Sequence, residues 1–200
     1  MTHAPSPTRT ARRSLAAAFA AFAVALGLAV AAPPAAAQTI LGAAPPLLQA
    51  VEDGDLERAR AEILRGENPN MVHTDGRNGV IIAARNGDLE MVELLVDGGG
   101  NPNWQDDIGN SPLHWAIENG DYATVDLLLS LGASPDPRNR QGLTPVMAAA
   151  RDGYRDIVER LLEANADLGV RDYTGRSALD YARTSRAPGI EPVLRAAGAQ

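Results

Sequence analysis

A period of 33 residues constrains the fold of this chain more than any other feature of its sequence. Residues 110–116, which read Asn-Ser-Pro-Leu-His-Trp-Ala, have counterparts one period earlier and one and two periods later, without an insertion. Two columns keep one residue type through four units: Gly54, Gly87, Gly120 and Gly153, and Ala50, Ala83, Ala116 and Ala149. A fixed period of this length is typical of proteins that stack one supersecondary unit on the next. We therefore expect a repeat array instead of a single globular core.

Each unit contains the signals of a short inner helix. Ser111, Thr144 and Ser177 stand at the predicted helix starts, where a side-chain hydroxyl accepts a hydrogen bond from a free backbone N–H group. Pro112 and Pro145 follow at the first helical position, which needs no N–H donor. The pattern predicts inner helices that begin near residues 46, 79, 112, 145 and 178, the first four of which end at the glycine column in a left-handed conformation.

A second, outer helix follows each inner helix. Asp55, Asp88 and Asp121 are placed to cap these helices, and apolar residues such as Val92 and Leu95 recur along one side. A helix pair of this size cannot bury its apolar side alone, so neighbouring pairs must pack together as a solenoid.

Three units depart from the pattern. Residues 46–72 and 172–199 diverge most, as expected of the units that cap the two ends of a solenoid. The unit that contains Asn78 and Gly79 has neither the helix-starting proline nor the histidine of residues 111–114. We expect it to be the internal unit that opens most easily.

The Ser-Pro-Leu-His sequence of residues 111–114 resembles the repeat unit of the ankyrin family, and the resemblance covers roughly residues 45 to 199. The residues that match the structural motif are Ser111, Pro112, His114, Gly120, Thr144, Pro145 and Gly153. The resemblance implies an all-α solenoid of about five helix-turn-helix units with short β-hairpin-like loops. We expect the units at about residues 46–72, 73–105, 106–138, 139–171 and 172–199. It also implies that His114 is a structural hydrogen-bonding residue that links the loop turns.

The N-terminal segment has the composition of an export signal. Residues 1–37 contain three arginines as their only charges, an apolar run at residues 15–32, and small residues up to Ala37. We expect a signal peptide cleaved after Ala37, with Arg12-Arg13 also fitting the twin-arginine route. The alternative is an uncleaved membrane anchor, because the run approaches the ~20 residues that span a bilayer.

An exported protein of this kind resembles exported bacterial ankyrin-repeat proteins and would be periplasmic or secreted. Residues 38–45, rich in Ala, Gly and Pro, are expected to form a flexible lead-in.

The charge balance disfavours nucleic acid as a partner. The chain has a net charge of -7, and all 18 of its basic residues are arginines. Cleavage after Ala37 would leave 15 arginines against 25 acidic residues, a net charge of about -10. The chain has no cysteine and cannot form disulfides. We expect a monomer whose stability depends on packing.

No sequence motif indicates catalysis, a metal or a cofactor. The chain has no nucleophile elbow, phosphate-binding glycine loop or calcium loop. His73 falls in a loop column and is expected to be an exposed turn residue, while Asp106 and Asp107 are expected to serve the turns. We therefore expect a protein that is not an enzyme, with a hydrolase or metal enzyme as the least favoured alternative.

The resemblance implies that the loop tips and the inner helices bind another protein. The loop residues in the family's contact columns include Trp104, Gln105, Asp107, Ile108, Asn110, Arg138, Arg140, Arg171, Tyr173 and Arg176. Trp104 is interpreted either as a binding hot spot or as a residue that packs against the neighbouring loop. Trp115 is expected to lie in the core between the helices. The arginines near Trp104 and Tyr173 suit an acidic or aromatic partner segment.

One inner-helix column alternates in charge from unit to unit. Its members are Glu52, Arg85, Glu118 and Arg151, and the last three are also candidate contact residues. Stacked units would bring them together as a ladder. Either the ladder pairs with itself and contributes ~0 to 1 kcal/mol per surface pair, or it also sets the register between repeats.

Overall fold

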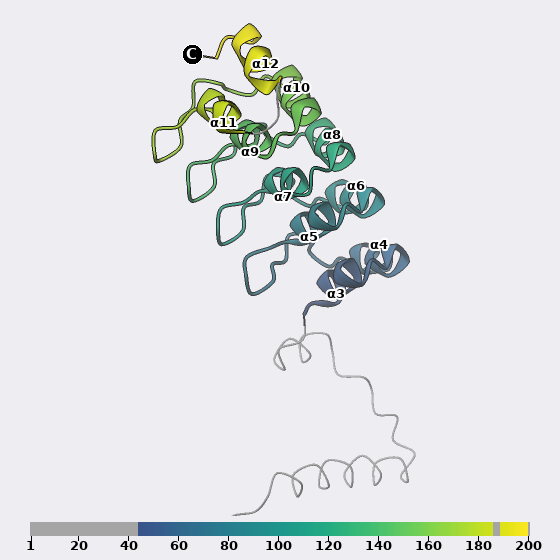
Figure 1. The fold of residues 1–200 in the computed structure, drawn as a ribbon. Helices are drawn as coiled ribbons and strands as arrows, with labels where there is room; N and C mark the ends of the chain where they lie inside the picture. The colour runs from purple at the N-terminus through teal and green to yellow at the C-terminus, as the bar shows by residue number, and fades with distance from the viewer. Residues whose placement is uncertain (1–43, 186–188, 200) are drawn as a thin grey trace, which may run out of the picture. The chain divides into compact units, whose positions relative to one another are not determined.

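The computed structural model describes residues 44–185 and 189–199, and this part of the chain is all-α, as predicted (Figure 1). The proposed signal peptide and residues 38–43 of the proposed lead-in lie outside the described residues. None of the described helices is long and apolar enough to cross a membrane.

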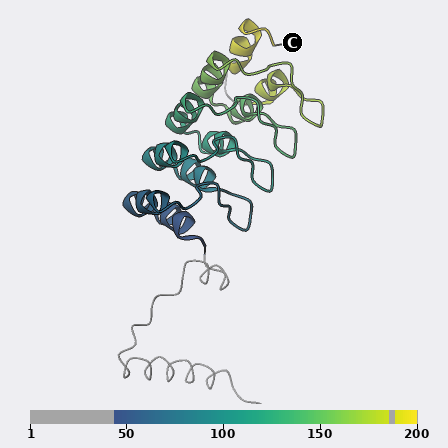
Figure 2. The ribbon, with the colours of Figure 1, turned by 180° about the vertical axis from the view of Figure 1, so that it is seen from behind.

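The described helices alternate between an inner and an outer row. The inner helices are α3 (Pro46–Asp53), α5 (Gly79–Asn86), α7 (Pro112–Glu118), α9 (Pro145–Asp152) and α11 (Ala178–Thr184). The outer helices are α4 (Leu56–Leu64), α6 (Leu89–Asp97), α8 (Tyr122–Ser130), α10 (Arg155–Glu163) and α12 (Ile190–Ala196). All five inner helices begin at the predicted residues. Figures 1 and 2 show four loops that project on the side of the inner row.

Side chains cap three of the five described inner helices, two of them as predicted. Ser111 and Ser177 each accept a hydrogen bond from the backbone N–H group three residues later, at 3.4 and 3.3 Å. Asn78 caps α5 in the same way, at 3.0 Å. The prediction for Thr144 is wrong, because its buried hydroxyl has no hydrogen-bond partner among the described residues. The start of α9 instead has Pro145 at its first position, which needs no donor.

The outer caps and the glycine column follow the prediction. Asp55, Asp88 and Asp121 accept hydrogen bonds from the first turns of α4, α6 and α8 at 2.9 to 3.2 Å. The four glycines of the column have positive φ angles between 66° and 90°. In the first three units, a glycine at the end of the inner helix and an aspartate at the start of the outer helix therefore form the turn between the two helices.

The core runs continuously between the two rows of helices. Leu95, Leu128 and Leu161 occupy equivalent positions on successive outer helices and are fully buried. The alanine column of the inner helices is also fully buried, and its small side chains occupy the layer where neighbouring inner helices pack. No unit has a core of its own, so each depends on its neighbours for burial.

Four hairpin-like loops join one unit to the next. We call them the first (residues 72–78), second (105–111), third (138–144) and fourth loop (171–177). In the last three, a buried side chain accepts two backbone N–H bonds within its own loop; these residues are Asp106, Asn139 and Asp172. The β-pairing among the described residues is a single bridge between Val72 and Asn78.

Neighbouring loops hydrogen-bond to each other edge to edge. In each case a backbone N–H group donates to a carbonyl oxygen of the preceding loop, from Asp107 to Asp75 (3.3 Å), from Arg140 to Ile108 (3.1 Å) and from Tyr173 to Gln141 (3.1 Å). Each bond contributes on the order of 1 kcal/mol. Together they hold the loop tips in a fixed row.

Loop glycines allow this close approach. A Cβ atom on Gly109, where φ is +78°, would lie 2.8 Å from the backbone nitrogen of Arg140 in the next loop. Gly76 and Gly142 are equally close to the loops that follow them. Gly175 has a similar φ of +86°, but a Cβ there would meet no atom within 4 Å, because no further loop follows it in the described chain.

His114 links α7 to the third loop, as the resemblance implied. Its Nε2 lies 3.1 Å from the carbonyl oxygen of Leu143, and its Nδ1 lies 3.2 Å from the backbone nitrogen of Ser111. The backbone N–H of Ser111 must donate to Nδ1, so Nε2 carries the proton and donates to Leu143. Burial is the main cause that lowers the pKa of His114. The bridge therefore requires a neutral imidazole.

We predict that this bridge makes stability depend on pH. The unfolded chain protonates His114 near its ordinary pKa of about 6.5, whereas the folded chain resists protonation until a lower pH. Wild type should therefore lose stability relative to His114→Gln as pH falls through about 6.5. Urea unfolding from about pH 7.5 to about pH 5 measures this difference. Equal pH profiles for wild type and His114→Gln would contradict the prediction.

Candidate functional site

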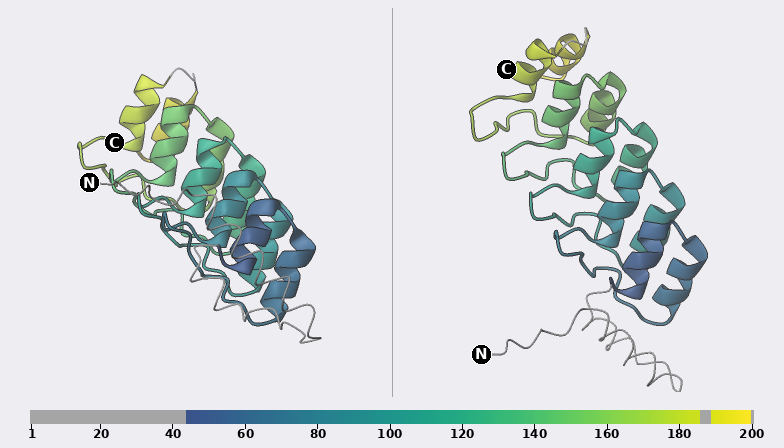
Figure 3. Two further views of the ribbon diagram at one scale, coloured as in Figure 1. Left: turned by 90° about the horizontal axis from the view of Figure 1, so that it is seen from below. Right: turned by 60° about the horizontal axis from the view of Figure 1, so that its bottom comes forward.

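Two adjoining cavities lie between the loop tips and the inner helices. The first, of about 330 Å³, is bounded by the second and third loops and by α7 and α9. The second, of about 300 Å³, is bounded by the first and second loops and by α5 and α7. Ile108 lines both cavities. We call them together the loop–helix groove; Figure 3 shows the loops gathered on the side of the inner helices.

Seven of the predicted contact residues line the groove. They are Asn110, Glu118, Arg140 and Arg151 in the first cavity, Arg85 and Asp107 in the second, and Ile108 in both. The others do not line these two cavities; Trp104 directly precedes the second loop, and Gln105, Arg138, Arg171, Tyr173 and Arg176 lie on the loops. Trp115 and Asp152 also line the groove, although neither was predicted to do so.

The groove combines an exposed apolar side chain with unpaired charges. Ile108 is 51% exposed at the tip of the second loop. Arg140 and Glu118 are exposed on opposite walls of the first cavity. Within the described residues, neither side chain has a hydrogen-bond or ion-pair partner that would neutralise it. These three groups are available to a ligand.

The prediction that Trp115 is a core residue is wrong. Its indole is half-buried on the wall of the second cavity, where the N–H group donates to the Asp106 carboxylate at 2.9 Å. The guanidinium carbon of Arg85 lies 5.2 Å from the ring centre. A half-buried indole needs a hydrogen-bond acceptor, and the loop supplies one that the core does not.

Tyr181 repeats this arrangement two units later, in the same column. Its hydroxyl donates to Asp172 at 2.6 Å, and Arg176 lies over its ring at 5.7 Å. Burial alone would raise the pKa of Asp172, but the bonds from Tyr181 and from the Arg176 and Thr174 backbone outweigh it and lower that pKa to about 2. A spacing of nine residues between the loop aspartate and the aromatic residue is the sequence signal that could have located both pairs.

Trp104 packs against the neighbouring loop, which confirms the second of its two interpretations. Its half-buried indole N–H donates to the carbonyl oxygen of Gly76 at 2.8 Å. Its role in partner binding stays a prediction. Gln105 makes a comparable link to the third loop, because its side-chain amide donates to the carbonyl oxygen of Arg138 at 2.9 Å.

The charge ladder of the inner helices does not form. No ion pair among the described residues joins two members of the column. Arg151 instead pairs with Asp152 beside it, at 2.7 Å, and Glu52 lies 3.6 Å from His73. Both interpretations of the ladder assumed mutual pairing, and the ion pairs of Arg151 and Glu52 are instead made with residues outside the column.

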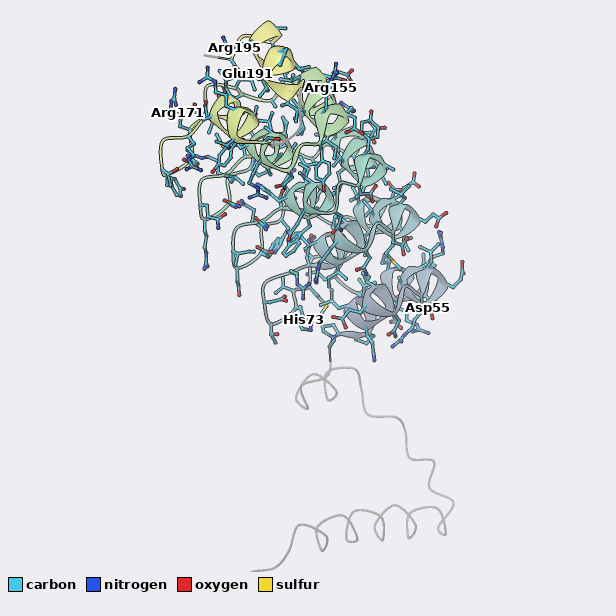
Figure 4. All side chains as sticks on the ribbon, in the orientation of Figure 1. Asp55, His73, Arg155, Arg171, Glu191 and Arg195 are labelled. Carbon is cyan, nitrogen blue, oxygen red and sulfur yellow. The ribbon has the colours of Figure 1, made fainter. Side chains whose placement is uncertain are left out.

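The third and fourth loops carry an arginine cluster. Arg138 donates to the carbonyl oxygen of Arg171 at 2.7 Å, and its guanidinium lies 5.1 Å from the ring centre of Tyr173. Tyr173 is 70% exposed. Figure 4 shows Arg171 on the fourth loop, at the opposite end of the loop row from His73.

His73 is less exposed than predicted. It is half-buried in the first loop because the carboxylates of Glu52 and Asp75 lie 3.6 and 3.7 Å from its ring nitrogens. Within residues 44–185 and 189–199, no group of three or more His, Asp and Glu side chains is placed to hold a metal ion. The described groove presents an apolar side chain, cations and hydrogen-bonding groups.

Comparison with known protein families agrees with this architecture. Residues 47–139 match a family model described as ankyrin repeats in three copies, and residues 128–182 match one described as ankyrin repeats in many copies. A search of curated proteins found no relative that matches the chain. The two matches together cover most of the stack of helix pairs and loops, and the chain belongs to the ankyrin-repeat family.

Proposed function

We propose that this protein is exported and acts as a non-catalytic module that holds a partner polypeptide in the loop–helix groove. Ankyrin repeats are protein–protein interaction modules, and this chain contains them along most of its described length. The observation that carries the groove assignment is Ile108, an apolar side chain left half exposed between two cavities. Exposed apolar groups beside concave surfaces mark binding sites.

The loop row supports this proposal because it is held in place before a partner arrives. The backbone bonds between loops and the Trp104 bond to Gly76 fix the tips in one arrangement. A surface that needs little ordering loses less conformational entropy on binding. Side chains such as Arg140 and Ile108 are then free to make contacts, since the backbone carrying them is already bonded.

Export is proposed from residues 1–37, whose arginines, apolar run and small residues have the order of a signal peptide. We expect the mature chain to begin at Gln38 and to be found outside the cytoplasm. Intact-mass measurement of the protein recovered from the fractionated source cells tests this. A full-length chain in the membrane fraction would instead favour a membrane-tethered scaffold, in which the apolar run is kept as an anchor.

Photo-crosslinking tests the groove. We predict that a benzophenone amino acid at Gln141, an exposed residue that lines the first cavity, crosslinks to a defined polypeptide in source cells. The same group at Glu93, exposed on outer helix α6, should give no such product. Adding Ile108→Glu should reduce the Gln141 crosslink by about tenfold, because a carboxylate replaces the apolar contact.

Leu64→Glu is the matched control. Leu64 is 82% exposed at the end of outer helix α4, so this substitution makes the same chemical change away from the groove. It should leave the crosslink unchanged. Crosslinks of equal yield from Gln141 and Glu93, or a loss that Leu64→Glu shares with Ile108→Glu, would refute the groove as the binding site.

A further inference from the structure

We propose that the partner segment is acidic. In this proposal, which rests on the binding function proposed above, an extended polypeptide lays its carboxylates along the tips of the third and fourth loops and places one apolar side chain against Ile108.

The charge carried by the loop tips changes sign along the row of loops. In the first loop Asp75 pairs with Arg77 at 2.5 Å, and in the second loop Asp107 is exposed. The third and fourth loops carry exposed arginines: Arg138, Arg140, Arg171 and Arg176. The aspartate of the fourth loop, Asp172, is buried and bonded within its own loop. This end of the row is therefore locally basic on a chain whose net charge is -7.

Three of these four guanidinium groups have no carboxylate partner within the described chain. Arg140 has no side-chain partner, and Arg138 and Arg176 lie over the rings of Tyr173 and Tyr181. Arg171 is the exception, at 3.6 Å from Asp180. Natural surfaces intersperse charges of both signs, so an uncompensated cluster of arginines on a fixed loop row favours an anionic ligand.

The tyrosines beside these arginines favour a carboxylate over an aromatic side chain as that ligand. The guanidinium carbons of Arg138 and Arg176 already lie 5.1 and 5.7 Å from tyrosine ring centres, so each group has an aromatic contact within the chain but no carboxylate. Donors in a guanidinium plane match the two oxygens of a carboxylate. Arg138 is also held by its bond to the Arg171 carbonyl oxygen, so less freedom is lost when a carboxylate binds.

The lining of the first cavity limits how far along the groove the acidic residues of the partner segment can extend. Its apolar lining includes Ile108, Leu143 and Ala148, while Glu118 and Asp152 lie on the helix wall. Arg151 neutralises Asp152, whereas Glu118 has no ion-pair partner among the described residues and repels an acidic side chain that approaches the helix wall. The group that enters against Ile108 is therefore apolar, and the acidic groups remain at the loop tips. At the second loop, Asp107 repels acidic side chains of the partner in the same way. The acidic part of the partner segment is therefore restricted to the third and fourth loops.

Selection from a random linear peptide library tests the partner chemistry without knowledge of the natural partner. Peptides selected on the mature protein should be enriched in Asp and Glu around one apolar residue. Their affinity should fall by about tenfold or more for Arg138→Gln/Arg140→Gln, and should fall with rising salt. The matched control is Arg60→Gln/Arg155→Gln, which removes the same charge from outer helices and should bind like wild type; Figure 4 shows Arg155 on α10. Thermal unfolding followed by circular dichroism confirms that both variants are folded.

Three results would overturn the proposal. In the first, the selected peptides are enriched in Lys and Arg. In the second, the two double variants lose peptide affinity equally. In the third, selection on wild type gives no more acidic peptides than selection on the Arg138→Gln/Arg140→Gln protein. A labelled single-stranded oligonucleotide that binds the same arginines more tightly than the acidic peptides would also overturn it, in favour of nucleic acid. If the Gln141 crosslink to a polypeptide persists in any of the first three cases, the groove function stands and the acidic preference alone is refuted.

Discussion

Side-by-side packing of the helix pairs is the interaction on which the rest of this structure depends. Each pair contributes one buried stripe, such as the column of Leu95, Leu128 and Leu161, and no pair has enough apolar surface to form a core alone. Packing at a constant repeat brings each loop to the same position against its neighbour. The hydrogen bonds between loops are a consequence of this spacing, and the fixed row of loop tips follows from those bonds.

The polar groups of the repeats divide into those that serve the structure and those that remain available. The first group is buried and forms hydrogen bonds within its own loop or to a neighbouring loop; it consists of Asp106, Asn139, Asp172 and His114. Ile108 and Arg140 lie on the same loops, but their side chains take no part in these hydrogen bonds. The proposed binding face is therefore made of side chains that the packing of the units does not use, so these residues can differ from loop to loop while the fold stays the same.

Much of the fold could be predicted from the sequence because its determinants are local. Serine caps, the glycine column and the proline at the first helical position act within one unit, and the 33-residue period extended them to every inner helix start. Thr144 failed as a cap because a propensity for a position does not guarantee that the hydroxyl reaches its donor. Ile108 was placed on the binding face from its loop column alone.

The rest of the site depends on which of several nearby partners a side chain takes, and the period does not determine this. Trp115 turned toward Asp106 and Arg85, and Arg151 took Asp152 in place of the ladder. In both cases residues from different elements compete for one group. The nine-residue spacing from Asp106 to Trp115 and from Asp172 to Tyr181 was present in the sequence. It indicates a hydrogen bond only once the loop and the inner helix are known to face each other.

Two matched glycine substitutions test the stacking of the units most directly. Gly109→Ala and Gly175→Ala both place a side chain in the left-handed region, which costs about 1 kcal/mol in each case. The alanine at Gly109 would also meet the backbone of the next loop, whereas the one at Gly175 would meet nothing. The account predicts that Gly109→Ala lowers the free energy of unfolding, measured in urea, by about 1–3 kcal/mol more than Gly175→Ala does. Equal losses for the two variants would contradict a structure in which successive loops lie in direct contact.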